Sequence, residues 1–253
     1  MKRAPVAGLL VSAVAACAGG EAAHLPEEGK LEELVIFVYD RSTSIPDHTL
    51  EIARELTSDR LEELTHGDRI AALQLLQLSL AEPPQRWSEQ IPERQYQAAA
   101  IRADSMARAR FLDDVRVHLA QSFSDPKGRD DINGTDILST LHDVAEQVRP
   151  YPDRRTTLYL FSDMLQSTRE MEMEDLRDMP PSNWVSEMKA RGRLPDLSGV
   201  CVFVVGARVD TEAGQRVKAF WEEYFKATGA TLLDRNYTLR PVELPVDPCP
   251  EAR

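Results

Sequence analysis

Four apolar runs of strand length, separated by longer segments of mixed polarity, constrain the fold of this chain more than any other feature. The runs are rich in Val, Leu, Ile, Ala and aromatic residues, and they lie at residues 34–39, 69–80, 156–161 and 200–205. Continuous apolar runs are typical of strands buried on both faces of a parallel sheet, where neither face meets water. The sequence therefore predicts an α/β protein with a mainly parallel sheet.

The segments between these runs carry apolar residues at helical spacing. We expect a short final strand near residues 231–233, and helices at about residues 50–64, 95–123, 137–148 and 211–228. Strands that alternate with helices predict a doubly wound sheet flanked by helices. The connection at about 81–132 exceeds what this core requires, so we expect a helical insertion there, and we expect an irregular rim at about 165–199.

The N-terminus has the pattern of a secretion leader followed by a tether. Positive charge at Lys2 and Arg3 precedes an apolar stretch that is too short to span a bilayer. Residues 14–17, Val-Ala-Ala-Cys, resemble the lipobox of bacterial lipoproteins, in which a peptidase cuts before a lipid-bearing cysteine. The resemblance implies a signal peptide at 1–16 and an acylated Cys17, with palmitate as one of its chains. An ordinary signal peptide with an incidental cysteine is the alternative.

Residues 17–30 are small, polar and acidic, which predicts a flexible tether.

The lipobox resemblance also implies a location, the bacterial cell envelope. Lipid chains on Cys17 would hold the folded part beside a membrane without inserting it. Ala18 rather than Asp follows the cysteine. By comparison with enterobacterial lipoproteins, this implies the periplasmic face of the outer membrane if the bacterium is Gram-negative.

Three places beyond the expected strands combine carboxylate and hydroxyl side chains. Asp40, Ser42 and Ser44 follow the first apolar run as D-x-S-x-S, Thr135 precedes a helix, and Asp163 follows the third run. Ligands of open α/β sheets bind at the carboxyl ends of the strands, so we expect these side chains at one edge. Oxygen ligands without histidine or thiolate suit Mg²⁺, Mn²⁺ or Ca²⁺ rather than zinc or copper.

These residues occur in the order found in von Willebrand factor A (vWA) domains with a metal-ion-dependent adhesion site (MIDAS), which residues 31–240 resemble. The resemblance implies that Asp40, Ser42, Ser44, Thr135 and Asp163 bind a divalent cation, Mg²⁺ first among the candidates. It further implies that the cation captures an Asp or Glu of a partner protein. The expected function is therefore metal-dependent protein–protein interaction, not catalysis.

One position departs from that family, in which glycine often follows the third-loop aspartate. Met164 stands there, so we expect a turn that avoids the positive φ allowed by glycine. A simpler interpretation of the same residues is also open. Asp40 and Ser42 could cap the first helix, and Thr135 or Asp136 could cap another, because such side chains satisfy free amide groups.

Two other functions stay open at this point. A Mg²⁺-dependent phosphohydrolase similar to haloacid-dehalogenase enzymes could use Asp40 as its nucleophile and hold Mg²⁺ with Asp163. Those enzymes carry D-x-D at the first motif, whereas Ser42 takes the second acidic position here. Alternatively, the chain is an envelope scaffold whose metal site is vestigial.

Charge and cysteine usage add two constraints. Thirty Lys and Arg against 42 Asp and Glu give a net charge of −12, which argues against a nucleic-acid partner. Among three cysteines, Cys201 lies in an apolar run, and Cys249 lies in a Pro-rich tail at residues 241–253. Cys201 either packs as a small apolar residue or pairs with Cys249 in an oxidising compartment.

Overall fold

Six strands form one sheet in the order β3-β2-β1-β4-β5-β6. We analysed a computed structural model, which describes residues 32–42, 44–75, 86–93, 101–124, 134–173 and 179–250. The strands are β1 (Glu33–Asp40), β2 (Arg69–Leu75), β3 (Arg86–Gln90), β4 (Arg155–Phe161), β5 (Val200–Val205) and β6 (Thr231–Thr238). The leader, Cys17 and the tether expected at residues 1–30 lie outside the described residues.

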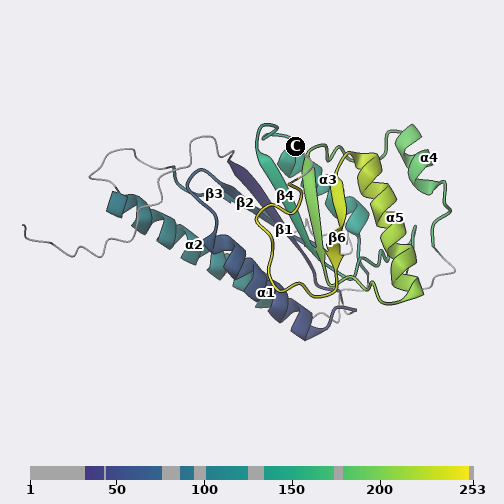
Figure 1. The fold of residues 1–253 in the computed structure, drawn as a ribbon, viewed down its shortest axis with the longest axis horizontal. Coiled ribbons are helices and arrows are strands. Elements are labelled where there is room, and N and C mark those ends of the chain that lie inside the picture. The colour runs from purple at the N-terminus through teal and green to yellow at the C-terminus, as the bar shows by residue number, and fades with distance from the viewer. Residues whose placement is uncertain are drawn as a thin grey trace, which may run out of the picture. The chain divides into compact units, whose positions relative to one another are not determined.

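The pairing of the strands defines a doubly wound sheet. β1 pairs in parallel with β2 on one side and with β4 on the other, and β4, β5 and β6 continue in parallel. Only β3, at one edge, runs antiparallel. The arrows of the parallel strands therefore point to a common edge (Figure 1). Chain order reverses between β1 and β4, and doubly wound sheets bind their ligands at such a switch point.

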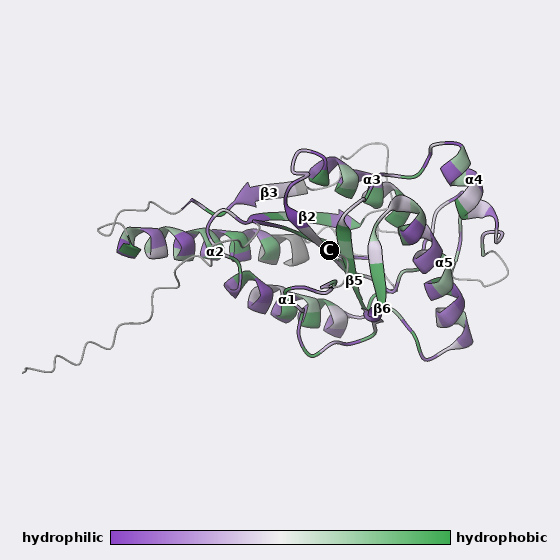
Figure 2. Cartoon of the chain, turned by 45° about the horizontal axis from the view of Figure 1, so that its top comes forward, coloured by the Kyte–Doolittle hydropathy of each residue, from purple (hydrophilic) through white to green (hydrophobic). Residues whose placement is uncertain are grey.

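Helices cover both faces of this sheet. They are α1 (Asp47–Glu62), α2 (Ile101–Ser124), α3 (Ile137–Val148), α4 (Trp184–Ala190) and α5 (Glu212–Thr228). Hydrophobic colouring is strong in β2 and β5, whereas β3 is mostly hydrophilic, and α1, α2 and α5 carry both kinds of residue (Figure 2). No helix in the described part of the chain is long and apolar enough to cross a membrane.

Alternate residues of each strand enter two separate cores, because successive side chains of a strand point to opposite faces. One core packs β-strand residues such as Ile36, Leu160 and Val202 against α3, α4 and α5. The other packs Phe37 and Phe203 against α1 and α2. All eight residues of β1 are buried, as expected of a central strand with both faces covered.

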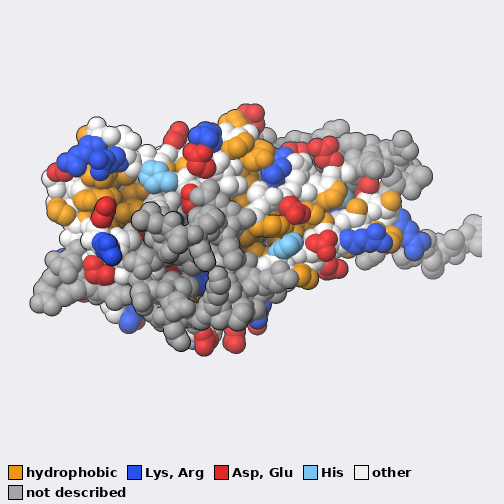
Figure 3. All heavy atoms as spheres, turned by 180° about the vertical axis from the view of Figure 1, so that it is seen from behind, with side chains coloured by type: hydrophobic (Ala, Val, Ile, Leu, Met, Phe, Trp, Pro, Cys, Tyr) orange, Lys and Arg blue, Asp and Glu red, His pale blue; other side chains and the backbone are white. Residues whose placement is uncertain are grey.

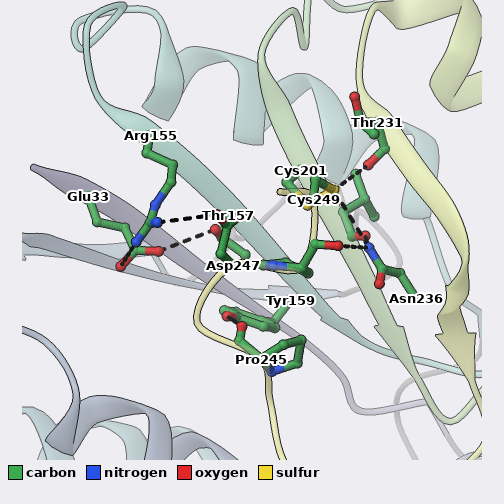
Figure 4. Close-up of a disulfide and its surroundings, with 12 residues drawn as sticks. Glu33, Arg155, Thr157, Tyr159, Cys201, Thr231, Asn236, Pro245, Asp247 and Cys249 are labelled. Carbon is green, nitrogen blue, oxygen red and sulfur yellow. Dashed lines mark hydrogen bonds and ion pairs between the residues drawn. A yellow bond between two sulfur atoms is a disulfide. The ribbon is translucent and has the colours of Figure 1, made fainter. Parts of the chain in front are cut away.

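The C-terminal segment covers a part of the second face where no described helix lies. It returns across the sheet (Figure 1), and Leu244 packs into the same core as Phe203. The Tyr159 hydroxyl donates a hydrogen bond of 2.6 Å to the Pro245 carbonyl. A disulfide joins Cys201 of β5 to Cys249, with their Cα atoms 5.8 Å apart (Figure 4). The tail is thus part of the packed domain, and pairing is the alternative that the structure supports for Cys201.

A buried ion pair holds α1 against the sheet. Arg60 and Glu33 are almost completely buried, and Arg60 Nη2 lies 2.6 Å from Glu33 Oε2. Arg60 Nε donates a hydrogen bond of 3.0 Å to the Tyr159 hydroxyl. Because Tyr159 also contacts the tail, this network connects α1, β1, β4 and the C-terminal segment. Removing one partner of such a pair would leave an uncompensated buried charge.

The predicted doubly wound α/β fold is confirmed by the strand order. The four apolar runs form β1, β2, β4 and β5, although residues 76–80 of the second run lie outside the described part. The expected insertion at about 81–132 contributes β3 to the sheet, and α2 packs Leu112, Val115 and Leu119 into the second core. The expected rim contains α4, and the final strand extends to Thr238.

Replacing Cys201 by Ser should lower the free energy of unfolding by about 4 kcal/mol, because the disulfide closes a loop between residues 48 positions apart. Denaturant titration of the oxidised wild type and of Cys201→Ser measures the difference. Reductant should bring the wild type to the stability of the variant and leave the variant unchanged. Equal stabilities in the absence of reductant would contradict the structural role of this bond.

Candidate metal centre

Asp40 occupies the end of β1 at the switch point of the sheet. Its side chain is fully buried, and Asp40 Oδ1 accepts a hydrogen bond of 2.9 Å from the backbone N–H of Ser42. Tyr39 pairs with Phe161 of β4, so the next residues of the two strands, Asp40 and Ser162, lie side by side. The strand register therefore sets what Asp40 contacts across the sheet.

Ser162 connects the two central strands. Its hydroxyl donates a hydrogen bond of 2.7 Å to Asp40 Oδ2 and accepts one of 2.9 Å from the backbone N–H of Met164. Asp163, the next residue, is partly exposed, and its Oδ1 accepts 3.0 Å from the N–H of Leu165. The carboxylates of Asp40 and Asp163 are close enough to repel each other.

The two serines of the first loop contact both carboxylates. Ser42 Oγ and Ser44 Oγ share a hydrogen bond of 2.9 Å. The Ser44 hydroxyl also lies within hydrogen-bonding reach of the Asp163 carboxylate. Four of the five predicted residues, from β1 and from the loop after β4, thus form one connected cluster of oxygen atoms.

Thr135, the fifth predicted residue, is bonded through its backbone to the loop that follows Asp163, not to the four oxygen-bearing side chains of the cluster. Its N–H and C=O each form a backbone hydrogen bond with Ser167, of 3.0 and 2.9 Å. The side chain of Gln166 is almost fully buried. It accepts a hydrogen bond of 2.8 Å from the N–H of Ile137 and donates one of 3.1 Å to Asp136 Oδ1. These bonds fix the start of α3 against the third loop, so Thr135 lies next to the segment that carries Asp163.

Helix capping does not account for Asp40 and Ser42. The N-cap of α1 is Pro46, which makes no side-chain capping bond, and the contacts of Asp40 are with Ser42 and Ser162. At α3 the capping interpretation does hold for Asp136, which accepts 3.1 Å from the N–H of Ser139. The buried carboxylate of β1 therefore needs another explanation.

The expectation that the turn after Asp163 avoids positive φ is wrong. Met164 has φ of +64° and is fully buried. Its carbonyl accepts a hydrogen bond of 2.8 Å from the indole N–H of Trp221 on α5. The turn keeps the backbone shape that glycine would favour, with these hydrogen bonds compensating for the unfavourable contacts of the Met164 Cβ.

Burial and repulsion disfavour negative charge at this edge. Burial raises the pKa of the Asp40 carboxyl to about 6, and repulsion by Asp163 adds to that rise, while hydrogen bonds from Ser162 and Ser42 oppose it. Burial likewise raises the pKa of the Asp163 carboxyl, against hydrogen bonds from Leu165 and Ser44. No ion pair in the described part of the chain involves either carboxylate.

This donor set fits a hard divalent cation. Two carboxylates without a basic partner would be neutralised by one M²⁺, and hydroxyl oxygens complete a coordination sphere without adding charge. Among the described residues, no group of three or more His, Cys, Asp or Glu side chains is arranged to hold a metal. A cation at this edge would therefore depend on hydroxyl and water oxygens in addition to Asp40 and Asp163.

Sequence reasoning missed two polar residues that organise this centre. Ser162 directly precedes Asp163, and the parallel register of β1 and β4 would have placed it beside Asp40. Gln166 lies in an irregular segment, and no periodic pattern marks it as a contact of α3. Both act on the candidate ligands through hydrogen bonds with neighbouring residues.

Comparisons with known proteins concern the fold alone. No protein-family model matches the chain, and no curated protein matches it. The structure is similar to proximal thread matrix protein 1 from the mussel byssus, with 15% identity and a TM-score of 0.43, over 84% of this chain and 44% of that chain. It is also similar to a von Willebrand factor type A protein from Catenulispora acidiphila, with 12% identity and a TM-score of 0.31, over 79% of this chain and 43% of that chain.

The chain spans less than half the length of either of these structures. Strand order and pairing define the class of protein here, a doubly wound α/β domain. A cluster of carboxylate and hydroxyl oxygens lies at its switch point.

In a buffer with chelator, the stability advantage of Asp40→Asn over the wild type should increase as pH rises from 4 to 7. The folded state keeps the Asp40 proton up to a pKa of about 6, whereas the unfolded chain releases it near pH 4, so the wild type loses stability through this window. The gain should be on the order of 3 kcal/mol. Denaturant titration at each pH measures it, and an advantage independent of pH would contradict the assignment.

Proposed function

We propose that this chain is a membrane-anchored envelope lipoprotein with a vWA-like domain, which binds a divalent cation at a MIDAS and mediates metal-dependent protein–protein interaction. The observation that carries the proposal is the pairing of Asp40 and Asp163, two carboxylates that repel each other at the switch point and form no ion pair with a described basic residue. Asp40, Ser42, Ser44, Thr135 and Asp163 would hold the cation. Mg²⁺ is the first candidate, and Mn²⁺ and Ca²⁺ suit the same oxygen ligands.

The charge of the centre determines what it attracts. A bound M²⁺ would supply a positive centre that two carboxylates roughly neutralise, so that it could still accept one more oxygen ligand from outside. Asp163 and Ser44 reach the surface, whereas Asp40 is buried beneath them. A partner protein would thus present an Asp or Glu side chain from the exposed side of the cluster.

The distribution of charge supports a protein partner in preference to nucleic acid. On the face shown in Figure 3, Lys and Arg side chains are interspersed with Asp and Glu side chains. The chain is acidic overall, with a net charge of −12. Binding of phosphates requires clustered basic side chains, so we propose no nucleic-acid partner.

Two features support the envelope. The pair Cys201–Cys249 is the kind of disulfide that persists in oxidising compartments such as the periplasm. The lipobox-like residues 14–17 suit a lipid on Cys17. The protein would then be held at the cell envelope by its N-terminal lipid, on the periplasmic face of the outer membrane in a Gram-negative bacterium.

Binding accounts for the centre better than phosphoryl transfer does. A nucleophilic carboxylate must reach its substrate, but Asp40 is fully buried and both of its oxygens accept hydrogen bonds. Ser42 stands where a second acid would be needed. We therefore propose no enzymatic activity. A scaffold with a vestigial site would have the same fold, and titration with metal distinguishes it.

Isothermal titration with Mg²⁺ should show one site in the wild type. Asp163→Ala should weaken binding by more than about tenfold, because even residues that merely orient metal ligands contribute that much. Asp210→Ala is a matched control, since Asp210 is an exposed aspartate in the loop after β5. Absence of Mg²⁺ binding by the wild type, or equal binding by Asp163→Ala, would contradict the proposed site.

Capture of a partner from envelope extract should require both the metal and the carboxylates. Wild-type protein is expected to retain a partner with Mg²⁺ and to release it with chelator, whereas Asp40→Asn should retain none in either buffer. The reason is that the partner carboxylate binds the cation directly. Mass spectrometry of the eluates measures recovery, and a partner set that is indifferent to both chelator and substitution would refute the role of the metal.

A further inference from the structure

Met164 adopts a backbone conformation that its side chain disfavours. Among the described residues it is the one non-glycine residue with positive φ, at +64°. The left-handed region crowds the Cβ of an L-residue, so it persists only where the surroundings determine it. Met164 is fully buried, and therefore protein groups, not water, must hold its backbone in place.

Two hydrogen bonds hold this turn. The Met164 N–H donates 2.9 Å to Ser162 Oγ, and the Met164 carbonyl accepts 2.8 Å from Trp221 Nε1. Buried backbone groups need partners. A turn with ordinary φ would reorient both peptide groups and break these bonds inside the core.

Trp221 is a rigid donor. It is fully buried in α5, where its ring lies 5.1 Å from Phe220, 5.4 Å from Tyr224 and 6.0 Å from Phe225, measured between centroids. These neighbours belong to the apolar face that α5 packs on the sheet. The indole therefore cannot follow a displaced turn, and it restricts the turn to one position.

Ser162 and Leu165, which flank the pair Asp163–Met164 in the chain, hold the two carboxylates of the candidate centre. Ser162 Oγ donates 2.7 Å to Asp40 Oδ2, and the N–H of Leu165 donates 3.0 Å to Asp163 Oδ1. A change in the turn would move both donors. We propose that Trp221 is a positioning residue for the cation site, because its N–H holds Met164 in the left-handed conformation that directs these two bonds.

This role rests on the proposed function, and it makes a specific claim about residue 164. Glycine adopts positive φ without the Cβ contacts. With Met164→Gly, the turn should keep its shape when the indole hydrogen bond is absent. With Met164→Val, a β-branched residue, the turn should be strained even when Trp221 is intact.

Titration of the full chain with Mg²⁺ tests the claim as a double-mutant cycle. Trp221→Phe should lower affinity roughly three- to tenfold, as expected for one lost hydrogen bond. Met164→Gly should bind within about twofold of the wild type, and the double variant should regain most of the loss. Trp184→Phe is the matched control, since Trp184 also contacts Phe220, at 5.7 Å, and it should not change affinity.

A second readout does not require Trp221 to be replaced. In a Trp87→Phe, Trp184→Phe background, Trp221 is the one tryptophan left, and its fluorescence should respond to Mg²⁺. Asp163→Asn in the same background should abolish the response. If Trp221→Phe fails to fold, this response and weaker Mg²⁺ binding by Met164→Val carry the test.

The outcomes separate the two proposals. Failure of the wild type to bind Mg²⁺ contradicts the proposed function and, with it, the role of Trp221. Wild-type binding that Trp221→Phe leaves unchanged, or a double variant as weak as Trp221→Phe, overturns the positioning role alone. Saturating Mg²⁺ that binds without changing Trp221 fluorescence also counts against it.

Discussion

The hydrogen bond from the Ser162 hydroxyl to Asp40 joins the ends of the two central strands, and the candidate metal centre depends on it. The register of β1 and β4 places these residues side by side, so the bond follows from strand pairing rather than from loop conformation. Asp163 directly follows Ser162 in the loop after β4, and its carboxylate is close enough to that of Asp40 to repel it. Asp40 ends one central strand and Asp163 lies two residues past the end of the other, so the sheet restricts both positions more than a long loop would.

The two carboxylates that would bind the cation destabilise the protein when no cation is bound. Two partly or fully buried carboxylates repel each other, and burial raises the pKa of both. A fold selected for stability alone would avoid such a pair, whereas binding sites commonly keep groups that destabilise the unliganded protein. The buried central strands, the Arg60–Glu33 pair and the Cys201–Cys249 disulfide stabilise the scaffold on which this edge is built.

The sequence predicts the scaffold well because β1, β2, β4 and β5 are buried on both faces and are consequently almost continuously apolar. It predicts β3 and α4 poorly. β3 is a five-residue edge strand of polar sequence, and α4 is a seven-residue helix, so neither is long or apolar enough to show a period.

The places of the candidate ligands in the fold were also predictable, since they end or follow strands or precede a helix, whereas metal binding by Asp40, Ser42, Ser44, Thr135 and Asp163 stays a prediction. The conformation of the turn after Asp163 could not be predicted from the sequence. Local preference argues against positive φ at Met164, and the carbonyl of that turn accepts a hydrogen bond from a tryptophan 57 residues away. Tertiary hydrogen bonds of this kind leave no local signal in the chain.

The proposed function requires a divalent cation to bind between Asp40 and Asp163. Anomalous scattering from crystals grown with Mn²⁺ tests it most directly, because the position of the metal is read without reference to any model of its ligands. We expect a single strong peak bounded by the oxygens of Asp40, Ser42, Ser44, Thr135 and Asp163. A map without a peak at the carboxyl ends of β1 and β4, or with the metal bound elsewhere on the domain, would contradict it.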